Sequence, residues 1–279
     1  MKLGFLSDLH LTTNGVHIEY AIQQLTKLVA EKGLSYVFIA GDTTNNPNNT
    51  KLFVDKVNEN LKDYLIKAEV YYIYGNHEFW HKSLTIETAN EQDVYYAHNK
   101  VVNVNEDTIV YGFNGWFDYS YIMDTEVGKN SDVPKNKNTL EEYGHIFFDL
   151  DRIGDIGATH EQMFMQNYNQ LEKVLEENAD KRILLFTHFV PDEQFVLFKG
   201  EISWDVNNAF MGSQKVGDLI SKYENVTDIT FGHTHTRFGT VNYKGVNYHC
   251  RPLGYKDYDG TWSDDFPEEL KRSLTIIEI

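Results

Sequence analysis

The chain has 279 residues, of which 41% are hydrophobic and 14% aromatic, so it contains enough apolar material for a folded core and is not a disordered tail. Its 25 lysines and arginines face 42 aspartates and glutamates, which gives a net charge of −17 at pH 7. This charge argues against a nucleic-acid backbone or an anionic membrane as the main partner, because both bind basic surfaces.

Targeting and redox features are few. Cys250 is the only cysteine in the sequence, so no intrachain disulfide can form. The short apolar start of the chain is not typical of a signal peptide, and no apolar run approaches the roughly 20 residues of a membrane helix. We therefore expect a cytoplasmic protein that does not associate with membranes.

Apolar strand-like runs and amphipathic repeats alternate at the start of the chain. Strands are expected over residues 2–7, 36–40 and 70–74. Helices are expected between them, at about 18–29 and 52–65, because apolar residues recur there every three or four positions. This strand–helix–strand–helix–strand order is typical of a parallel sheet covered by helices.

The later part of the chain predicts a second sheet within the same domain, which spans residues 1–279. Helical spacing is seen at 163–178 and, more weakly, at 205–223, where Gly212 and Gly217 interrupt it. Strand patterns occur at 101–104, 109–113, 182–187, 226–231, 240–243, 246–249 and 273–277, with hairpins expected for 101–113 and 240–249.

Residues 118–159 interrupt this regular pattern. The segment is polar and shows little periodicity. It is too short and too polar to bury a core of its own, so we interpret it as an insertion or cap. We expect this cap to border the active site and to set the size of the substrate.

Five short motifs, each after an apolar strand-like run, carry side chains that bind divalent cations. In parallel sheets, ligand sites form in the loops after the carboxyl ends of strands. Taken singly, each motif has an ordinary structural explanation, such as a turn aspartate or a core histidine. Their joint occurrence predicts a site for two metal ions, an arrangement that cleaves phosphate esters. The motifs are Asp8-Leu9-His10, Gly41-Asp42, Gly75-Asn76-His77-Glu78, Thr187-His188 and Gly232-His233-Thr234-His235.

In this order the motifs resemble those of the calcineurin-like metallophosphoesterase family, over about residues 1–250. The resemblance implies an α/β fold, a four-layer α/β/β/α sandwich of two mixed sheets flanked by helices. It also implies a metal-dependent phosphoric ester hydrolase. The loop Thr43-Thr44-Asn45-Asn46 lacks the Asp-Arg-Gly of protein serine/threonine phosphatases, and the motifs look closer to the bacterial phosphodiesterase branch.

The resemblance also implies roles for individual residues. His77 would be the catalytic histidine, which donates a proton to the leaving oxygen or stabilises the charge that develops there. Asp42 would bridge two divalent ions, which generate the attacking hydroxide. Manganese suits these oxygen and imidazole ligands best, with iron or zinc as alternatives. The implied metal ligands are Asp8, His10, Asp42, Asn76, His188, His233 and His235.

Several functional alternatives remain at this point. We expect a small phosphorylated substrate, with a phosphodiester slightly favoured over a phosphomonoester. A nuclease of the same superfamily is the second possibility, and a non-catalytic metal-binding interaction module is the third. The module is disfavoured because all of the implied ligands and His77 are present.

Three further hypotheses concern residues near the motifs. Glu78 is a candidate to hydrogen-bond a ligand imidazole. Arg237 is a candidate phosphate partner because it lies close to the last motif. Trp80 and Trp116 either stack on a substrate or close the core beneath the site.

Overall fold

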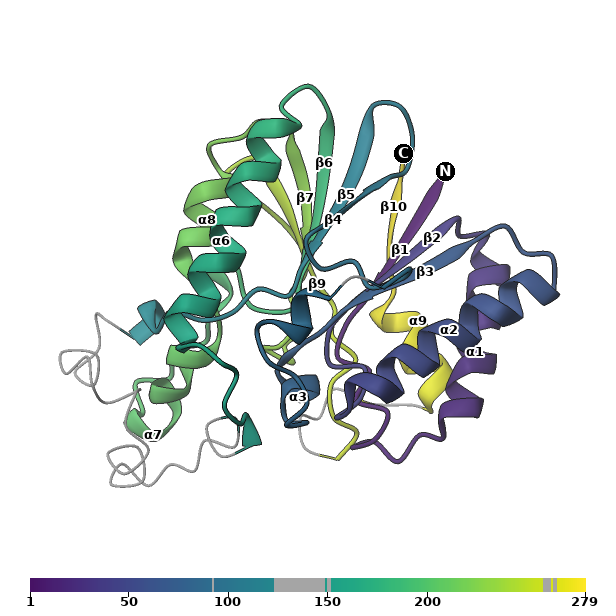
Figure 1. Cartoon of the computed structure of the whole chain (residues 1–279), viewed down its shortest axis with the longest axis horizontal. Coiled ribbons are helices and arrows are strands. Elements are labelled where there is room, and N and C mark those ends of the chain that lie inside the picture. Colours follow the sequence, from purple (N-terminus) through teal and green to yellow (C-terminus); the bar gives the residue numbers. More distant parts are fainter. Residues whose placement is uncertain (92, 123–148, 150–151, 258–261, 263–264) are drawn as a thin grey trace.

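The computed structural model of the chain describes residues 1–91, 93–122, 149, 152–257, 262 and 265–279 (Figure 1). Two β-sheets lie face to face, and helices cover their outer faces (Figure 1). The four-stranded sheet has the order β10-β1-β2-β3, and the six-stranded sheet has the order β4-β5-β6-β7-β9-β8. Both sheets are mixed, as the expected sandwich requires.

The first sheet is built from the N-terminal part of the chain and the last strand. Its parallel strands are β1 (Lys2–Leu6), β2 (Tyr36–Ala40) and β3 (Glu69–Ile73), and the C-terminal β10 (Thr275–Glu278) pairs antiparallel with β1. Three helices cover its outer face, namely α1 (Ile18–Lys32), α2 (Pro47–Asp63) and α9 (Phe266–Ser273) (Figure 1).

The second sheet has a parallel centre and two antiparallel edges. The strands β5 (Thr108–Phe113), β6 (Arg182–Thr187), β7 (Val226–Thr230) and β9 (Val246–Cys250) are parallel. The edge strands β4 (Lys100–Asn103) and β8 (Gly239–Tyr243) pair antiparallel with β5 and β9. Helices α6 (His160–Glu177) and α8 (Gln214–Ile220) lie on the outer face (Figure 1).

Short helical segments lie in the loops between these elements. They are α3 (Asn76–Phe79), α7 (Ile202–Asp205) and the 3-10 turns η1 (Thr88–Asn90), η2 (Ser120–Ile122), η4 (Glu193–Phe195) and η5 (Val206–Phe210). Within the described part of the chain, no helix combines the length and the apolar character needed to cross a bilayer.

The space between the sheets is filled by alternate residues of the strands. Phe38 of β2 lies with its ring centroid 5.2 Å from that of Phe5 and 5.1 Å from that of Phe186. The intervening residues, such as Val37 and Ile39, pack instead in the cluster beneath the helices. Both faces of each strand are buried, which explains why these strands appear as continuous apolar runs in the sequence.

Most of the expected elements are confirmed, and two differ. Residues 205–223 do not form one helix, because Gly212 at φ 151° lies where a Cβ would be 2.1 Å from the carbonyl oxygen of Val190, and a new helix begins after Ser213. Helix α9 was not predicted because it has only eight residues. Of the expected cap at 118–159, residues 123–148 and 150–151 lie outside the described residues.

A buried polar cluster joins neighbouring strands of the second sheet. The Asp228 carboxylate lies 3.0 Å from Nε2 of His249 and accepts hydrogen bonds from Arg182, Thr227 and Asn247 at 2.7–3.2 Å. Burial opposes ionisation, but these donors outweigh it and hold the pKa of Asp228 well below its ordinary value. His249 therefore has a structural role, as a partner of this buried carboxylate.

The substitution Asp228→Asn should lower the free energy of unfolding by about 2 kcal/mol at pH 7, because an amide cannot accept all of these hydrogen bonds. The folded-state pKa is depressed, so the stabilisation is present above the ordinary pKa of 3.8 and is lost as the pH falls below it. Urea unfolding at pH 7, 5 and 3 should show a difference that shrinks with acid. The exposed Asp180→Asn is the control, and a difference independent of pH would contradict the charge assignment.

Candidate metal centre

The five motifs meet at the carboxyl ends of strands from both sheets. Asp8 follows β1, Asp42 follows β2 and Asn76 opens α3 directly after β3. From the second sheet, His188 follows β6 and His233 follows β7. The parallel strands of each sheet end on the same side, so the loops that carry these residues gather at one end of the sandwich.

Their side chains form three overlapping groups of potential ligands. In each group the ligand atoms lie within 4.8 Å of one another. Asp42 belongs to two groups, and its Oδ2 lies 3.3 Å from Nε2 of His188 and 3.6 Å from Nε2 of His10. Asp42 therefore stands between two sets of imidazoles. The groups are Asp8–His10–His235, His10–Asp42–His77 and Asp42–His188–His233.

The remaining contacts bring every predicted ligand into this centre. Nε2 of His235 lies 3.4 Å from Asp8 Oδ1 and 2.9 Å from Nε2 of His10. On the other side of Asp42, Oδ1 of Asn76 lies 2.9 Å from Nε2 of His188. Imidazole nitrogens and carboxylate and amide oxygens thus converge, which is the donor set of a divalent transition metal.

The backbone of the centre is strained. Asp8, His10, Asp42, His233 and His235 all have positive φ, between 44° and 65°. The left-handed region costs a non-glycine residue roughly 1–2 kcal/mol. Strain concentrated in this way indicates a functional site, because the surrounding fold must hold these residues in place.

Two glycines of the motifs are required by close packing. A Cβ at Gly232 would lie 2.0 Å from Oδ2 of Asp8, and a Cβ at Gly75 would lie 2.2 Å from Oδ1 of Asp42. Each carboxylate therefore packs directly on the backbone of a strand-end loop. The glycines of Gly-Asn-His-Glu and Gly-His-Thr-His leave the space that these carboxylates occupy.

The electrostatics match a cation site. Burial opposes ionisation of Asp8, but the neighbouring histidines lower its pKa to about 2, and they hold that of Asp42 well below its ordinary value. Burial lowers the pKa of His233 to about 3 and keeps His10 neutral. Burial also disfavours charge on His188, yet Asp42 raises its pKa to about 9. Without metal, a proton on His188 therefore occupies a position where cation charge is favourable.

His77 belongs to one of the three groups but is not among the metal ligands predicted from the sequence, and both nitrogens of its ring have a partner. Nδ1 lies 3.0 Å from Oδ1 of Asn45, and Nε2 lies 2.8 Å from the hydroxyl of Tyr255. Burial lowers the pKa of His77 to about 4, so the ring is neutral. A neutral ring donates from Nδ1 to the Asn45 oxygen and accepts the Tyr255 hydroxyl at Nε2.

Tyr255 and Asn45 were not among the predicted site residues. The Tyr255 ring centroid lies 4.4 Å from those of His10 and His235, so this side chain covers one side of the centre. Asn45 shares the loop of Asp42, and this proximity was a usable signal. No sequence pattern marks Tyr255.

Glu78 does not bind an imidazole, contrary to the hypothesis from the sequence. Its buried carboxylate accepts five hydrogen bonds of 2.8–3.1 Å that tie the loop after β2 to the loop after β3. Burial and the charge of Asp42 raise its pKa to about 7 against the opposing effect of these donors. The donors are the backbone N–H groups of Asp42, Thr43, Thr44 and Gly75 and the hydroxyl of Thr50.

The other hypotheses about neighbouring residues are also decided. Trp116 is buried against Phe79, so it closes the core. The Trp80 ring centroid lies 3.5 Å from that of His77, and the guanidinium of Arg152 lies 4.3 Å from the Trp80 ring centroid. Arg237 is not a phosphate partner, because it pairs with the buried Glu269 at 2.9 Å.

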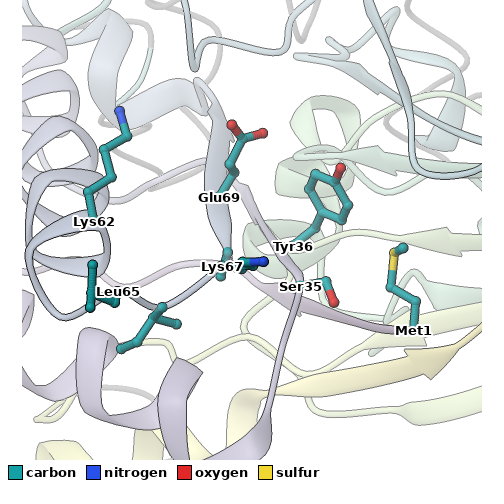
Figure 2. Close-up of a pocket in the computed structure, with 9 residues that line it drawn as sticks. Met1, Ser35, Tyr36, Lys62, Leu65, Lys67 and Glu69 are labelled. Carbon is teal, nitrogen blue, oxygen red and sulfur yellow. The ribbon is translucent and has the colours of Figure 1, made fainter.

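One cavity in the structure lies away from the ligand groups. Figure 2 shows a cavity of about 640 Å³ lined by residues such as Ser35, Tyr36, Lys67 and Glu69. These residues lie where β2 and β3 begin, at the opposite end of the sheet from the ligand groups. Among the described residues, no member of the three ligand groups lines this cavity.

Comparison with known proteins identifies the family. A family model for calcineurin-like phosphoesterases matches residues 1–237. The chain belongs to the calcineurin-like phosphoesterase family. This membership confirms the resemblance and places the protein among the metal-dependent phosphoester hydrolases.

Individual proteins match this chain only over a short segment or at low sequence identity. A probable glycerophosphodiester phosphodiesterase, GpdQ, of Arcobacter nitrofigilis is 38% identical over 65 residues, which are 23% of this chain and 22% of the relative. A dimetal phosphatase from Danio rerio shares the fold with a TM-score of 0.51 at 14% identity, over 90% of this chain and 87% of that one. GAP50 of Plasmodium aligns at a TM-score of 0.47 and 8% identity, over 91% and 72%.

The substitution Glu78→Gln should lower the free energy of unfolding of the metal-free protein by about 3 kcal/mol, because the NH₂ group that replaces one carboxylate oxygen cannot accept from the donors that face it. Urea denaturation in the presence of chelator measures the loss. The exposed Glu87→Gln on the same stretch of chain is the matched control. Coincident unfolding curves for wild type and Glu78→Gln would show that Glu78 does not anchor the loops.

Proposed function

We propose that this protein is a two-metal phosphoesterase that hydrolyses small phosphorylated molecules and prefers phosphodiesters to phosphomonoesters. The observation that carries this proposal is the position of the Asp42 carboxylate between two sets of buried imidazoles. The local similarity to a probable phosphodiesterase favours diesters. The net charge of −17 disfavours the nuclease alternative, because binding to nucleic acid requires a basic surface.

We assign each metal position to one side of Asp42. The first would be held by Asp8, His10 and His235, and the second by Asn76, His188 and His233, with Asp42 shared between them. Short distances within each set support this assignment. The absence of a thiolate from both sets favours manganese, with iron or zinc as alternatives.

When bound, two divalent cations supply Lewis acidity and make coordinated water acidic enough to act as a nucleophile near neutral pH. The chain holds the ligand side chains in place and buries them, which strengthens their electrostatic effect. His77 presents Nε2 to the position where the Tyr255 hydroxyl now lies, and Asn45 fixes the opposite ring nitrogen. Nε2 carries no proton in this neutral tautomer, so the ring would first take up a proton there and then donate it, or a hydrogen bond, to the leaving oxygen.

We retain the single-domain organisation over residues 1–279, with a cap at 118–159, as part of this proposal. One described residue of that segment, Asp149, touches Asn76, which supports a position beside the active site. The non-catalytic module remains disfavoured, because His77 lies beside a complete set of ligands.

His77→Asn should lower kcat about 10²–10⁴-fold, because a group that assists the leaving oxygen is lost. The content of bound metal should remain that of the wild type, since His77 is outside the assigned ligand sets. Turnover and metal analysis by mass spectrometry on the same samples separate the two effects. His81→Asn, a nearby histidine outside the ligand groups, is the control. Unchanged turnover would remove His77 from catalysis, and lost metal would make it a ligand.

The class of substrate is tested by stripping the protein with chelator, adding back Mn²⁺, and comparing a bis-aryl phosphodiester with the matching monoester. We expect no turnover without metal and faster cleavage of the diester with it. Parallel additions of iron and zinc test the choice of metal. A faster monoester would overturn the diester preference, and the absence of metal-dependent turnover of either ester would overturn the proposed activity.

A further inference from the structure

Asp149 contacts the candidate metal centre. Its carboxylate is buried and accepts hydrogen bonds from Nδ2 of Asn76 at 2.9 and 3.0 Å and from Nε1 of Trp80 at 2.5 Å. The residue lies outside all five motifs and outside both ligand sets. It nevertheless hydrogen-bonds the proposed ligand Asn76, and it also hydrogen-bonds Trp80, which packs on His77.

The first consequence concerns the amide of Asn76. Only the oxygen of an amide binds a cation, and the NH₂ group must face elsewhere. An ionised carboxylate can only accept hydrogen bonds, so Asp149 selects the orientation in which Nδ2 faces it. Oδ1 then faces His188 at 2.9 Å. The opposite orientation would place two oxygens against each other and turn the NH₂ group toward the metal position.

The second consequence concerns the packing of His77. The indole of Trp80 stacks on His77 with ring centroids 3.5 Å apart and an interplanar angle of 31°. The guanidinium of Arg152 lies 4.3 Å from the centroid of the same indole. The hydrogen bond from Nε1 to Asp149 fixes the rotation of this ring. The Asp149 carboxylate thus fixes both the orientation of the Asn76 amide and the position of the Trp80 ring that packs on His77.

We propose that Asp149 is a positioning residue that orients the Asn76 amide for the second metal ion and holds Trp80 against His77. Asp149 therefore influences how tightly the second metal ion is bound. This inference rests on the proposed role of Asn76 as a ligand. Loss of a partner that orients a metal ligand typically weakens metal binding 10–100-fold.

The first test is a calorimetric titration of chelator-stripped protein with Mn²⁺ alone. Wild type should bind two ions. In Asp149→Ala, one site should keep its Kd, and the other should weaken about 10–100-fold. Asp149→Asn should be intermediate, since its oxygen still accepts from Asn76, and this variant also serves if Asp149→Ala does not fold. Asp228→Asn removes another buried, hydrogen-bonded carboxylate and should leave both sites unchanged.

The second test measures the hydrogen bond between Trp80 and Asp149 in the metal-free protein. The indole N–H of Trp80, one of four tryptophans, is assigned in a ¹H–¹⁵N spectrum as the signal that disappears in Trp80→Phe. In wild type it should exchange slowly with solvent. In Asp149→Ala it should shift upfield and exchange faster, because its acceptor is gone.

The outcomes separate the two proposals. Equal affinities of both sites in wild type and Asp149→Ala would overturn the control of Asn76, and an unchanged indole signal would overturn the contact with Trp80. Failure of the wild type to bind Mn²⁺ would instead overturn the proposed two-metal function. A site-selective loss of metal together with a moved indole signal supports the inference, because general destabilisation would not weaken one site alone.

Discussion

Two ionised carboxylates, Asp8 and Asp42, are buried where the carboxyl ends of the two sheets meet, and the local structure is organised around them. Buried charge is costly unless it is paired and hydrogen-bonded. The backbone N–H of His233 donates to Asp8, and that of His77 donates to Oδ1 of Asp42. Imidazoles surround the remaining oxygens, and a proton on His188 supplies balancing charge. Glycines and left-handed residues let the loops approach this closely.

Polar side chains outside the predicted ligand set give this arrangement its rigidity. Glu78 ties two strand-end loops through their backbone N–H groups, and Asn45 and Tyr255 fix opposite nitrogens of His77. Each of these side chains joins segments that are separate in the sequence. A centre held in this way loses little free energy to reorganisation when a cation or a substrate binds.

Charge explains how such a centre can act within an acidic protein. The net charge of −17 disfavours extended anionic partners, while two divalent ions beside two carboxylates would create a local positive centre. A small phosphate ester experiences mainly that local field. Membership of the phosphoesterase family, the position of Asp42 between two sets of imidazoles and the acidic net charge are therefore all compatible with the proposed small phosphorylated substrate.

The sequence by itself predicted the strands, and its motifs, through their resemblance to a known family, predicted the sandwich of two mixed sheets and the residues that meet at the candidate metal centre. Hydrophobic periodicity and short strand-end motifs are local properties of the sequence. The carboxyl ends of neighbouring parallel strands lie at the same edge of a sheet, so residues that follow these strands come together independently of the loop sequences. Only the tertiary structure decided which side chains support the centre. Asp149 reaches Asn76, Tyr255 reaches His77 and Arg237 turns away to Glu269, because these contacts depend on the path of the chain between distant residues.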